Sequence, residues 1–218
     1  MPNASSSMTN PNIETFEPPI DIRIDELSKL SELLGQFMRI ERATYRDGRP
    51  ETNAEHTLHT MFLAVAYVSK YRPDLDPTSV ALLLMVHDVD ELYIGDVNSF
   101  IASDETLEDK EADEMTSHES VRRDFADYPF VLELFERYWA QDDPEAECAR
   151  SFEKTDPGFS HIHDGGRAIR VMGVESRDQF EKLEQRTVTR MGEYASADVL
   201  ALRKELGKRV ADTAFGTV

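Results

Sequence analysis

The chain has 218 residues, of which 40% are hydrophobic, and this length suits one domain with a sizeable core. Its formal net charge of −19 at pH 7 argues against broad binding to nucleic acid or to an anionic membrane. Cys148 is the only cysteine, which excludes an intrachain disulfide and indicates a reducing compartment. No apolar run approaches the length of a membrane span and no signal-peptide pattern is present, so we expect a soluble, cytoplasmic protein.

The N-terminal part of the chain predicts a tail followed by helices. Residues 1–20 are rich in Ser, Asn and Pro and are expected to be disordered, and residues 21–218 are expected to form a single domain. Apolar residues at helical spacing predict a first amphipathic helix from Asp21 to about Arg42. A loop is expected over 45–51, and a second helix over 53–71.

The next stretch combines a buried helix with acidic residues. Asp76-Pro77 has the pattern of a helix cap, and the residues from Val80 to Val86 are all apolar, which predicts a helix buried on every face. His87, Asp88, Asp90 and Glu91 follow without a polar transition. Carboxylates at the end of a buried helix are costly unless a positive charge meets them, and a divalent metal is the simplest such charge.

The remaining chain also reads as helical, with an acidic, solvated segment over 102–116. A helix is expected from Pro144 to Asp156, where Pro157-Gly158 should interrupt it, and Gly165-Gly166 predicts a further break. Three more stretches have helical composition: 130–139, 176–192 and 197–210. No strictly alternating stretch and no repeat is found, so the predicted fold class is all-α.

Four residues on different predicted helices are candidates for one metal site: His56, His87, Asp88 and Asp156. Two imidazoles and two carboxylates suit Mn, Fe, Co, Ni or Zn better than Mg or a dedicated Ca site. Each residue alone also has a simpler interpretation, such as a core histidine or a helix-ending aspartate. His59 is expected at the surface or in packing, with a role beside the ligands as the alternative.

The same residues carry a resemblance to a known family. Arg49-Pro-Glu-Thr-Asn-Ala-Glu-His56, the block from His87 to Asp96 (HDVDELYIGD) and Lys154-Thr-Asp156 resemble the HD-domain metal-dependent phosphohydrolases. More narrowly they resemble the 5′-deoxynucleotidase-like branch, with its H-D-x-x-E-x-x-x-G-D block. The resemblance covers roughly residues 22–160, and it implies a helical bundle with the metal site in a central cavity.

The resemblance also implies roles for individual residues. His56, His87, Asp88 and Asp156 would ligate one divalent metal, and Glu91 would orient or deprotonate the attacking water. Asp96 would hold the substrate, and Arg39 or Arg42 would contact its phosphate. Glu91 follows His87 by one helical turn, so both side chains are expected to face the same cavity.

Two departures from the family pattern concern the substrate and the last ligand. The branch carries an aromatic residue just after its phosphate-contacting Arg, and the stretch from Arg39 to Ala43 has none. The family usually continues its helix beyond the residue that corresponds to Asp156, where this chain has Pro157-Gly158. Only His118 lies between the His-Asp pair and Asp156, which favours one metal over two.

The leading hypothesis is a metal-dependent phosphohydrolase that cleaves a nucleoside monophosphate or a similar small phosphate. The alternatives are hydrolysis of a nucleotide di- or triphosphate, a non-catalytic nucleotide-binding domain, and a helical domain with a purely structural metal. The intact Glu91 and Asp96 disfavour a binding-only role, and a closed structural site would favour Cys and His ligands. A homodimer is a further expectation, because a second subunit would bury several apolar helix faces.

Overall fold

A computed structural model describes residues 19–46, 48–96 and 100–216 of the chain. The chain divides into two compact units, residues 1–35 and 36–218. The described part of the first unit consists mainly of helix α1 (Ile20–Phe37), whose last residues belong by number to the second unit. Residues 1–18 of the predicted tail lie outside the described residues.

The second unit is almost entirely helical, which confirms the predicted all-α class. Its helices are α2 (Asn53–Tyr71), α3 (Pro77–Val86), α4 (Glu91–Ile94), α5 (Asp104–Asp124), α6 (Pro129–Ala140), α7 (Pro144–His163), α8 (Arg167–Val171), α9 (Arg177–Met191) and α10 (Ala197–Phe215). None of the helices in the described ranges is both long and apolar enough to cross a membrane.

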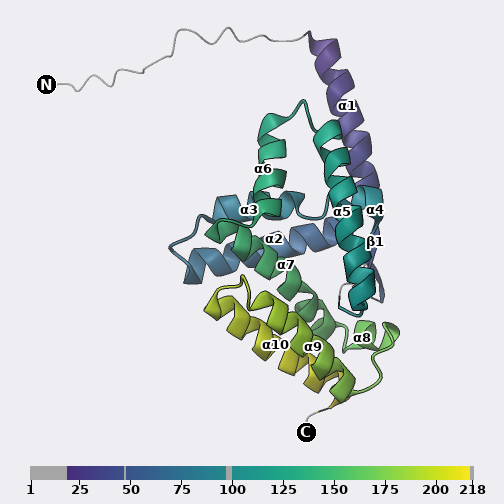
Figure 1. Cartoon of the computed structure of the whole chain (residues 1–218), viewed down its shortest axis with the longest axis vertical. Coiled ribbons are helices and arrows are strands. Elements are labelled where there is room, and N and C mark those ends of the chain that lie inside the picture. Colours follow the sequence, from purple (N-terminus) through teal and green to yellow (C-terminus); the bar gives the residue numbers. More distant parts are fainter. Residues whose placement is uncertain (1–18, 47, 97–99, 217–218) are drawn as a thin grey trace, which may run out of the picture. The chain divides into compact units, whose positions relative to one another are not determined.

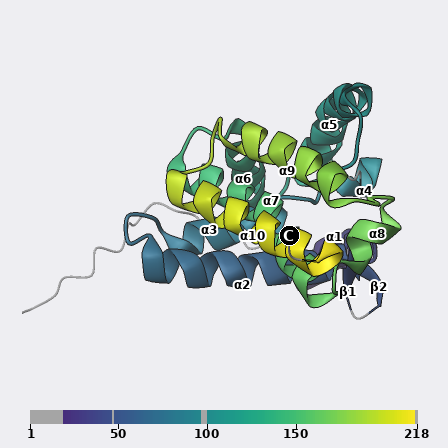
Figure 2. The same ribbon diagram turned by 90° about the horizontal axis from the view of Figure 1, so that it is seen from below.

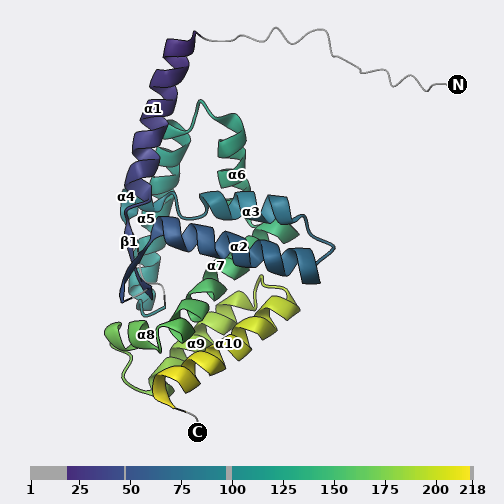
Figure 3. The same cartoon turned by 180° about the vertical axis from the view of Figure 1, so that it is seen from behind.

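Helix α7 is the central element of this unit. It packs against α2 and α3 on one side and against α10 on the other, and α9 covers α10 (Figures 1 and 3). Two residues of α7, Phe152 and Asp156, are almost fully buried as a result of this packing. Any side chain that α7 directs toward α2 and α3 therefore lies in the interior of the protein.

The predicted buried helix begins where its cap was expected. The side chain of Asp76 accepts hydrogen bonds from the backbone N–H groups of Thr78 (3.0 Å) and Ser79 (3.1 Å), and Pro77 occupies the first turn. Leu83 and Leu84 are fully buried, whereas Met85 is 40% exposed. The prediction of a helix buried on every face is therefore wrong at Met85, where the helix reaches the surface.

A β-hairpin replaces the predicted end of the first helix and the loop after it. Strands β1 (Glu41–Arg46) and β2 (Arg49–Thr52) pair antiparallel, with Arg46 opposite Arg49. Gly48 at φ 82° provides the turn, which is a conformation that glycine adopts without strain. These strands are too short to produce a clear alternating pattern. The hairpin contacts α7 and α8, and Figure 2 shows α8 beside it.

Helix α7 continues through Pro157-Gly158, so the predicted interruption after Asp156 is wrong. Proline removes one helical hydrogen bond, but packing on both sides of α7 offsets that loss. Gly158 permits the close approach of α10, because a Cβ at this position would lie 2.6 Å from Leu206 Cδ2. The helix ends instead at the predicted second break, where Gly165 and Gly166 both have positive φ.

Candidate metal centre and its cavity

The start of α2 fixes the first candidate ligand. Thr52 and Glu55 form a reciprocal capping box, and Arg49 Nη1 donates to Glu55 Oε2 at 2.9 Å. These hydrogen bonds, that of Arg49 first, lower the pKa of the Glu55 carboxyl to about 2. A capped first turn holds the helix rigid at its N-terminus, so His56, the next residue, points into the interior and is fully buried.

His56 on α2 converges with the adjacent pair His87 and Asp88 at the end of α3. One ligand atom from each lies within 4.8 Å of the others. His87 Nε2 is 2.9 Å from Asp88 Oδ2, and His56 Nε2 is 3.7 Å from the same oxygen. The fold thus brings three of the four predicted ligands into one buried cluster.

The orientation of His87 leaves one ring nitrogen directed at this cluster. Its Nδ1 donates to the carbonyl oxygen of Leu84 at 2.7 Å, because a carbonyl can only accept. Its Nε2 and that of His56 are buried and form no hydrogen bond with any described residue. Burial opposes the charged imidazolium of His87, yet the nearby carboxylate of Asp88 raises its pKa to about 9. The pocket therefore favours a positive charge between Nε2 and the carboxylate.

A divalent metal ion meets these requirements better than a proton. Neutral imidazole nitrogens and a carboxylate oxygen are common ligands of Mn, Fe, Co, Ni and Zn. An ion bound here would coordinate the two imidazole nitrogens, which form no hydrogen bond with any described residue, and would offset the buried charge of Asp88. The donor set thus fits the metal that the sequence predicts.

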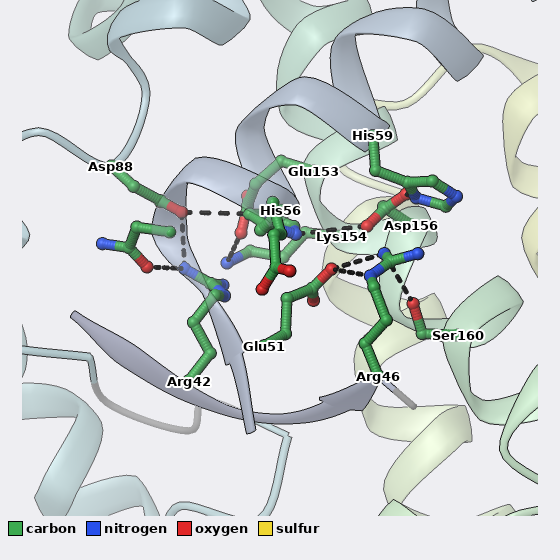
Figure 4. Close-up of polar contacts among 12 residues, drawn as sticks. Arg42, Arg46, Glu51, His56, His59, Asp88, Glu153, Lys154, Asp156 and Ser160 are labelled. Carbon is green, nitrogen blue, oxygen red and sulfur yellow. Dashed lines mark hydrogen bonds and ion pairs between the residues drawn. The ribbon is translucent and has the colours of Figure 1, made fainter. Parts of the chain in front are cut away.

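Asp156 approaches His56 from the other side of the ring. Its Oδ2 lies 3.1 Å from His56 Nδ1, and its Oδ1 lies 2.6 Å from His59 Nδ1 (Figure 4). Burial would raise the pKa of Asp156, but the two histidines hold it well below its usual value. Asp156 also forms a second group of possible ligands with Glu51 and His56, whose atoms lie within 4.8 Å of one another.

His59 differs from its expected place at the surface or in packing. Its side chain is 28% exposed, and it contacts the carboxylate of a predicted metal ligand. It follows His56 by three residues and so lies on the same face of α2, which is the sequence signal for this role. The structure supports the alternative that His59 acts beside the ligands.

The hairpin brings one of the two arginine candidates to the cluster. Arg42 lies on β1, where Nη1 is 2.6 Å from Asp88 Oδ2 and 3.1 Å from Asn53 Oδ1 (Figure 4). Arg39 lies before the strand and is exposed. Burial disfavours the charged guanidinium of Arg42, but Asp88 and Glu91 raise its pKa further above its usual value. Arg42 therefore reaches the cluster as a permanent cation.

Glu91 lies at the start of α4 and faces the same cluster. Its carboxylate accepts a hydrogen bond from Asn53 Nδ2 at 2.7 Å and lies 3.3 Å from Arg42 Nη1. Burial, followed by the charge of Asp88, raises the pKa of Glu91 to about 8. The chain turns between the end of α3 and the start of α4, so His87 and Glu91 do not share one continuous helix. They nevertheless line the same cavity, as predicted.

A polar cavity of about 180 Å³ opens beside the cluster. Asp96 contributes to its wall and lies 3.8 Å from Arg42 Nη1. The wall also contains side chains to which the sequence alone assigns no role there, among them His118, Trp139, Arg150, Glu153 and Lys154. Only Lys154 carried a signal, because it belongs to the Lys-Thr-Asp motif. The others arrive from helices whose register around the cavity depends on tertiary packing.

The chain is similar to known proteins in its family and in its fold. A model of the HD domain matches residues 34–194. The fold resembles the crystal structure of a predicted metal-dependent phosphohydrolase from Magnetospirillum magnetotacticum (TM-score 0.65, 20% identity, 89% of this chain and 99% of that one). It also resembles the PH0347 protein from Pyrococcus horikoshii (TM-score 0.56, 19% identity, 84% of this chain and 99% of that one). No curated protein matches the sequence.

Proposed function

Because the chain belongs to the HD-domain family, we propose that it is a metal-dependent phosphohydrolase that cleaves a nucleoside monophosphate or a similar small phosphomonoester. The observation that carries this proposal is the convergence of two buried imidazole nitrogens that form no hydrogen bond within the described part of the chain and one buried carboxylate at the wall of a polar cavity. The similar protein from Magnetospirillum magnetotacticum is itself described as a predicted metal-dependent phosphohydrolase, which supports the same reaction class.

His56, His87 and Asp88 would hold the metal. Asp156, the fourth predicted ligand, lies outside this cluster in the structure, so it would have to turn away from His56 Nδ1 to bind the same ion. A bound divalent metal would supply positive charge that polarises a phosphoryl oxygen and lowers the pKa of a water molecule. Asp156 now contacts Nδ1 of His56, so its carboxylate also fixes the orientation of that ring. Two histidines and two carboxylates favour Mn, Fe, Co, Ni or Zn.

Glu91 is the proposed general base. It lies at the cavity wall, and burial together with the charge of Asp88 raises its pKa, which increases the affinity of its carboxylate for the proton of an attacking water. The water oxygen forms a bond to phosphorus as the bond from phosphorus to the ester oxygen breaks. The proton accepted by Glu91 balances the proton that the leaving oxygen takes up.

Arg42 and Asp96 would position the substrate. Arg42 Nη1 lies among the carboxylates of Asp88, Glu91 and Asp96, so it is already at the cavity wall. A phosphate in the cavity would offer it a charge-assisted hydrogen bond in addition to these contacts. Asp96 is an acceptor at the same wall and would hold a hydroxyl group of the sugar or the attacking water.

A second candidate reaction is hydrolysis of a nucleotide di- or triphosphate. Longer phosphate chains need more positive charge than one metal ion and one arginine supply. The structure adds Arg150 and Lys154 to the wall of the cavity that contains Arg42. These two cations are the observation that keeps the candidate open.

The test is phosphate release from metal-stripped protein supplied in turn with Mn, Co, Ni, Zn or Mg. The substrates are nucleoside mono-, di- and triphosphates and simple sugar phosphates. We expect metal-dependent release from monophosphates, and release only from triphosphates would favour the second candidate.

Two variants test the assigned roles. Glu91→Gln should retain the metal and lose at least about a hundredfold in kcat, because the base is removed while the ligands remain. His87→Ala should lose both metal and turnover. Glu133→Gln, at an exposed position on α6, is the matched control and should behave as the unmodified protein. Full activity in Glu91→Gln would remove its role as a base.

A further inference from the structure

A second cavity adjoins the first and extends away from the candidate metal ligands. Its volume is about 90 Å³, and residues of α7, α9 and α10 contribute to its wall. Four charged residues line both cavities: Arg42, Asp96, Glu153 and Lys154. A molecule whose phosphate lies among these charges can therefore extend into the second cavity.

The walls of the second cavity are mainly apolar and partly aromatic. Phe100 and Phe180 lie with their ring centroids 5.7 Å apart, and Met172 and Val210 add further apolar surface. Gly207 allows the Glu184 side chain to pack closely against α10, because a Cβ on this glycine would lie 2.6 Å from Glu184 Oε1. Aromatic and aliphatic walls of this kind suit a flat, weakly polar ring.

The charged side chains of this cavity neutralise each other. Arg203 Nε donates to Glu184 Oε1 at 2.7 Å, and a second contact joins Nη2 to Oε2. Arg203 Nη1 also donates to the carbonyl oxygen of Lys154 at 2.7 Å. Both Glu184 and Arg203 are buried. A charged group placed beside this pair would gain little and would lose its hydration, so the cavity selects an uncharged group.

One polar atom in the cavity wall lacks a partner. His161 lines the cavity and is buried, and its Nδ1 forms no hydrogen bond with any described residue. Burial and the nearby Arg203 lower the pKa of His161 to about 4, so its ring is neutral near pH 7 and either nitrogen can donate or accept. A buried polar atom without a partner is costly, and a bound molecule would remove that cost.

We propose that the second cavity holds the organic part of the substrate, a flat uncharged heterocycle such as a nucleobase, and that His161 Nδ1 is its hydrogen-bond partner. This inference rests on the proposed function, because it places the phosphate at the polar cavity. It makes His161 a specificity-determining residue. A phosphate ester without a base, such as ribose 5-phosphate, leaves the second cavity empty.

The experiment compares binding and turnover for two kinds of substrate in the metal-loaded protein. The probes are the four common nucleoside 5′-monophosphates and ribose 5-phosphate. Loss of one hydrogen bond with a neutral partner corresponds to about a tenfold change. His161→Leu should therefore raise Kd and KM for the preferred nucleotide about tenfold and leave those for ribose 5-phosphate within about twofold. His161→Asn, which keeps a polar group near the position of Nδ1, should recover part of the loss.

A second variant closes the cavity without changing His161. Thr187 lines the cavity, and Thr187→Phe should fill it and reduce nucleotide binding while sparing ribose 5-phosphate. Thr189→Phe makes the same change at an exposed position on α9 and should have no effect.

The outcomes separate this inference from the proposed function. Equal use of nucleotides and ribose 5-phosphate by every variant would overturn the inference and leave a phosphohydrolase. No phosphate release from any substrate would overturn the proposed function. The inference about the second cavity would then be tested by nucleotide binding alone. Binding that His161→Leu weakens would support it, whereas no binding, or binding that His161→Leu leaves unchanged, would overturn it.

Discussion

Arg42 Nη1 lies 2.6 Å from Asp88 Oδ2, the same carboxylate oxygen that lies closest to the two imidazole nitrogens. The buried carboxylates of Asp88 and Glu91 need positive charge, and Arg42 supplies it from strand β1. A metal ion bound to Asp88 would supply positive charge to the same group. Arg42 therefore links the stability of the metal-free protein to the chemistry of the site.

Removing the charge of Arg42 should destabilise the metal-free protein more than the metal-bound one. Arg42→Met removes the guanidinium from beside the carboxylates of Asp88 and Glu91, and breaking a buried ion pair typically costs about 3–5 kcal/mol. A divalent metal should restore much of this loss. Urea unfolding with excess chelator and with excess Mn measures both states. Arg39→Met is the control because Arg39 is exposed. An equal loss with and without metal would show that Arg42 acts only in packing.

His59 should contribute to metal affinity through Asp156. Its Nδ1 lies 2.6 Å from Asp156 Oδ1, and partners that orient a ligand commonly contribute about 10–100-fold in affinity. We expect His59→Ala to weaken Mn binding about tenfold, and Asp156→Ala to weaken it more. Isothermal titration calorimetry measures both. His163→Ala, at an exposed position at the end of α7, should leave affinity unchanged. Unaltered metal affinity in His59→Ala would mean that His59 acts only in packing.

The buried pair of Glu184 and Arg203 should be sensitive to the loss of one partner and tolerant of the loss of both. Arg203→Leu leaves a buried carboxylate without its cation and should lower the free energy of unfolding by about 3–5 kcal/mol. Adding Glu184→Leu to that variant should recover a large part of the loss, since no charge then remains buried. Urea unfolding of the two single variants and the double variant measures the coupling. Additive losses would mean that the two side chains act independently.

His161 should make the protein less stable in mild acid. Its pKa is about 4 in the folded protein because of burial and Arg203, against about 6.5 when unfolded, with Asp156 partly opposing the shift. Between these values the unfolded chain binds a proton that the folded chain does not. The contribution of His161 to the free energy of unfolding is therefore complete above pH 6.5, and it falls by up to about 1.4 kcal/mol per pH unit toward pH 4.

The variant His161→Leu should lose this part of the pH dependence. As pH falls from 7 to 4, the free energy of unfolding of this variant should fall less than that of the unmodified protein. Urea unfolding at several pH values measures the shift, with His163→Leu as the exposed control. Parallel pH profiles for the unmodified protein and His161→Leu would contradict a neutral buried imidazole.

Local sequence signals predicted the elements whose ends are defined by side chains close in sequence. Helix α2 covers the expected residues 53–71 and carries a capping box, and α3 begins at the Asp76-Pro77 cap. These signals act over three or four residues, so they do not depend on the rest of the fold. The prediction failed where distant packing decides the outcome. Helix α7 crosses Pro157-Gly158 because its neighbours on both sides, including Leu206, stabilise the helical path.

The sequence by itself determined the helical class, the motif of the HD-domain family and the residue types that can hold a metal. The helical class follows from periodicity and from caps, and the family from the resemblance of the motif at His56, His87–Asp96 and Lys154–Asp156. The tertiary structure alone decided that Arg42 rather than Arg39 reaches Asp88, and that His161, Glu184 and Arg203 line a second cavity. Such contacts join residues far apart in the chain, and their geometry depends on how whole helices pack.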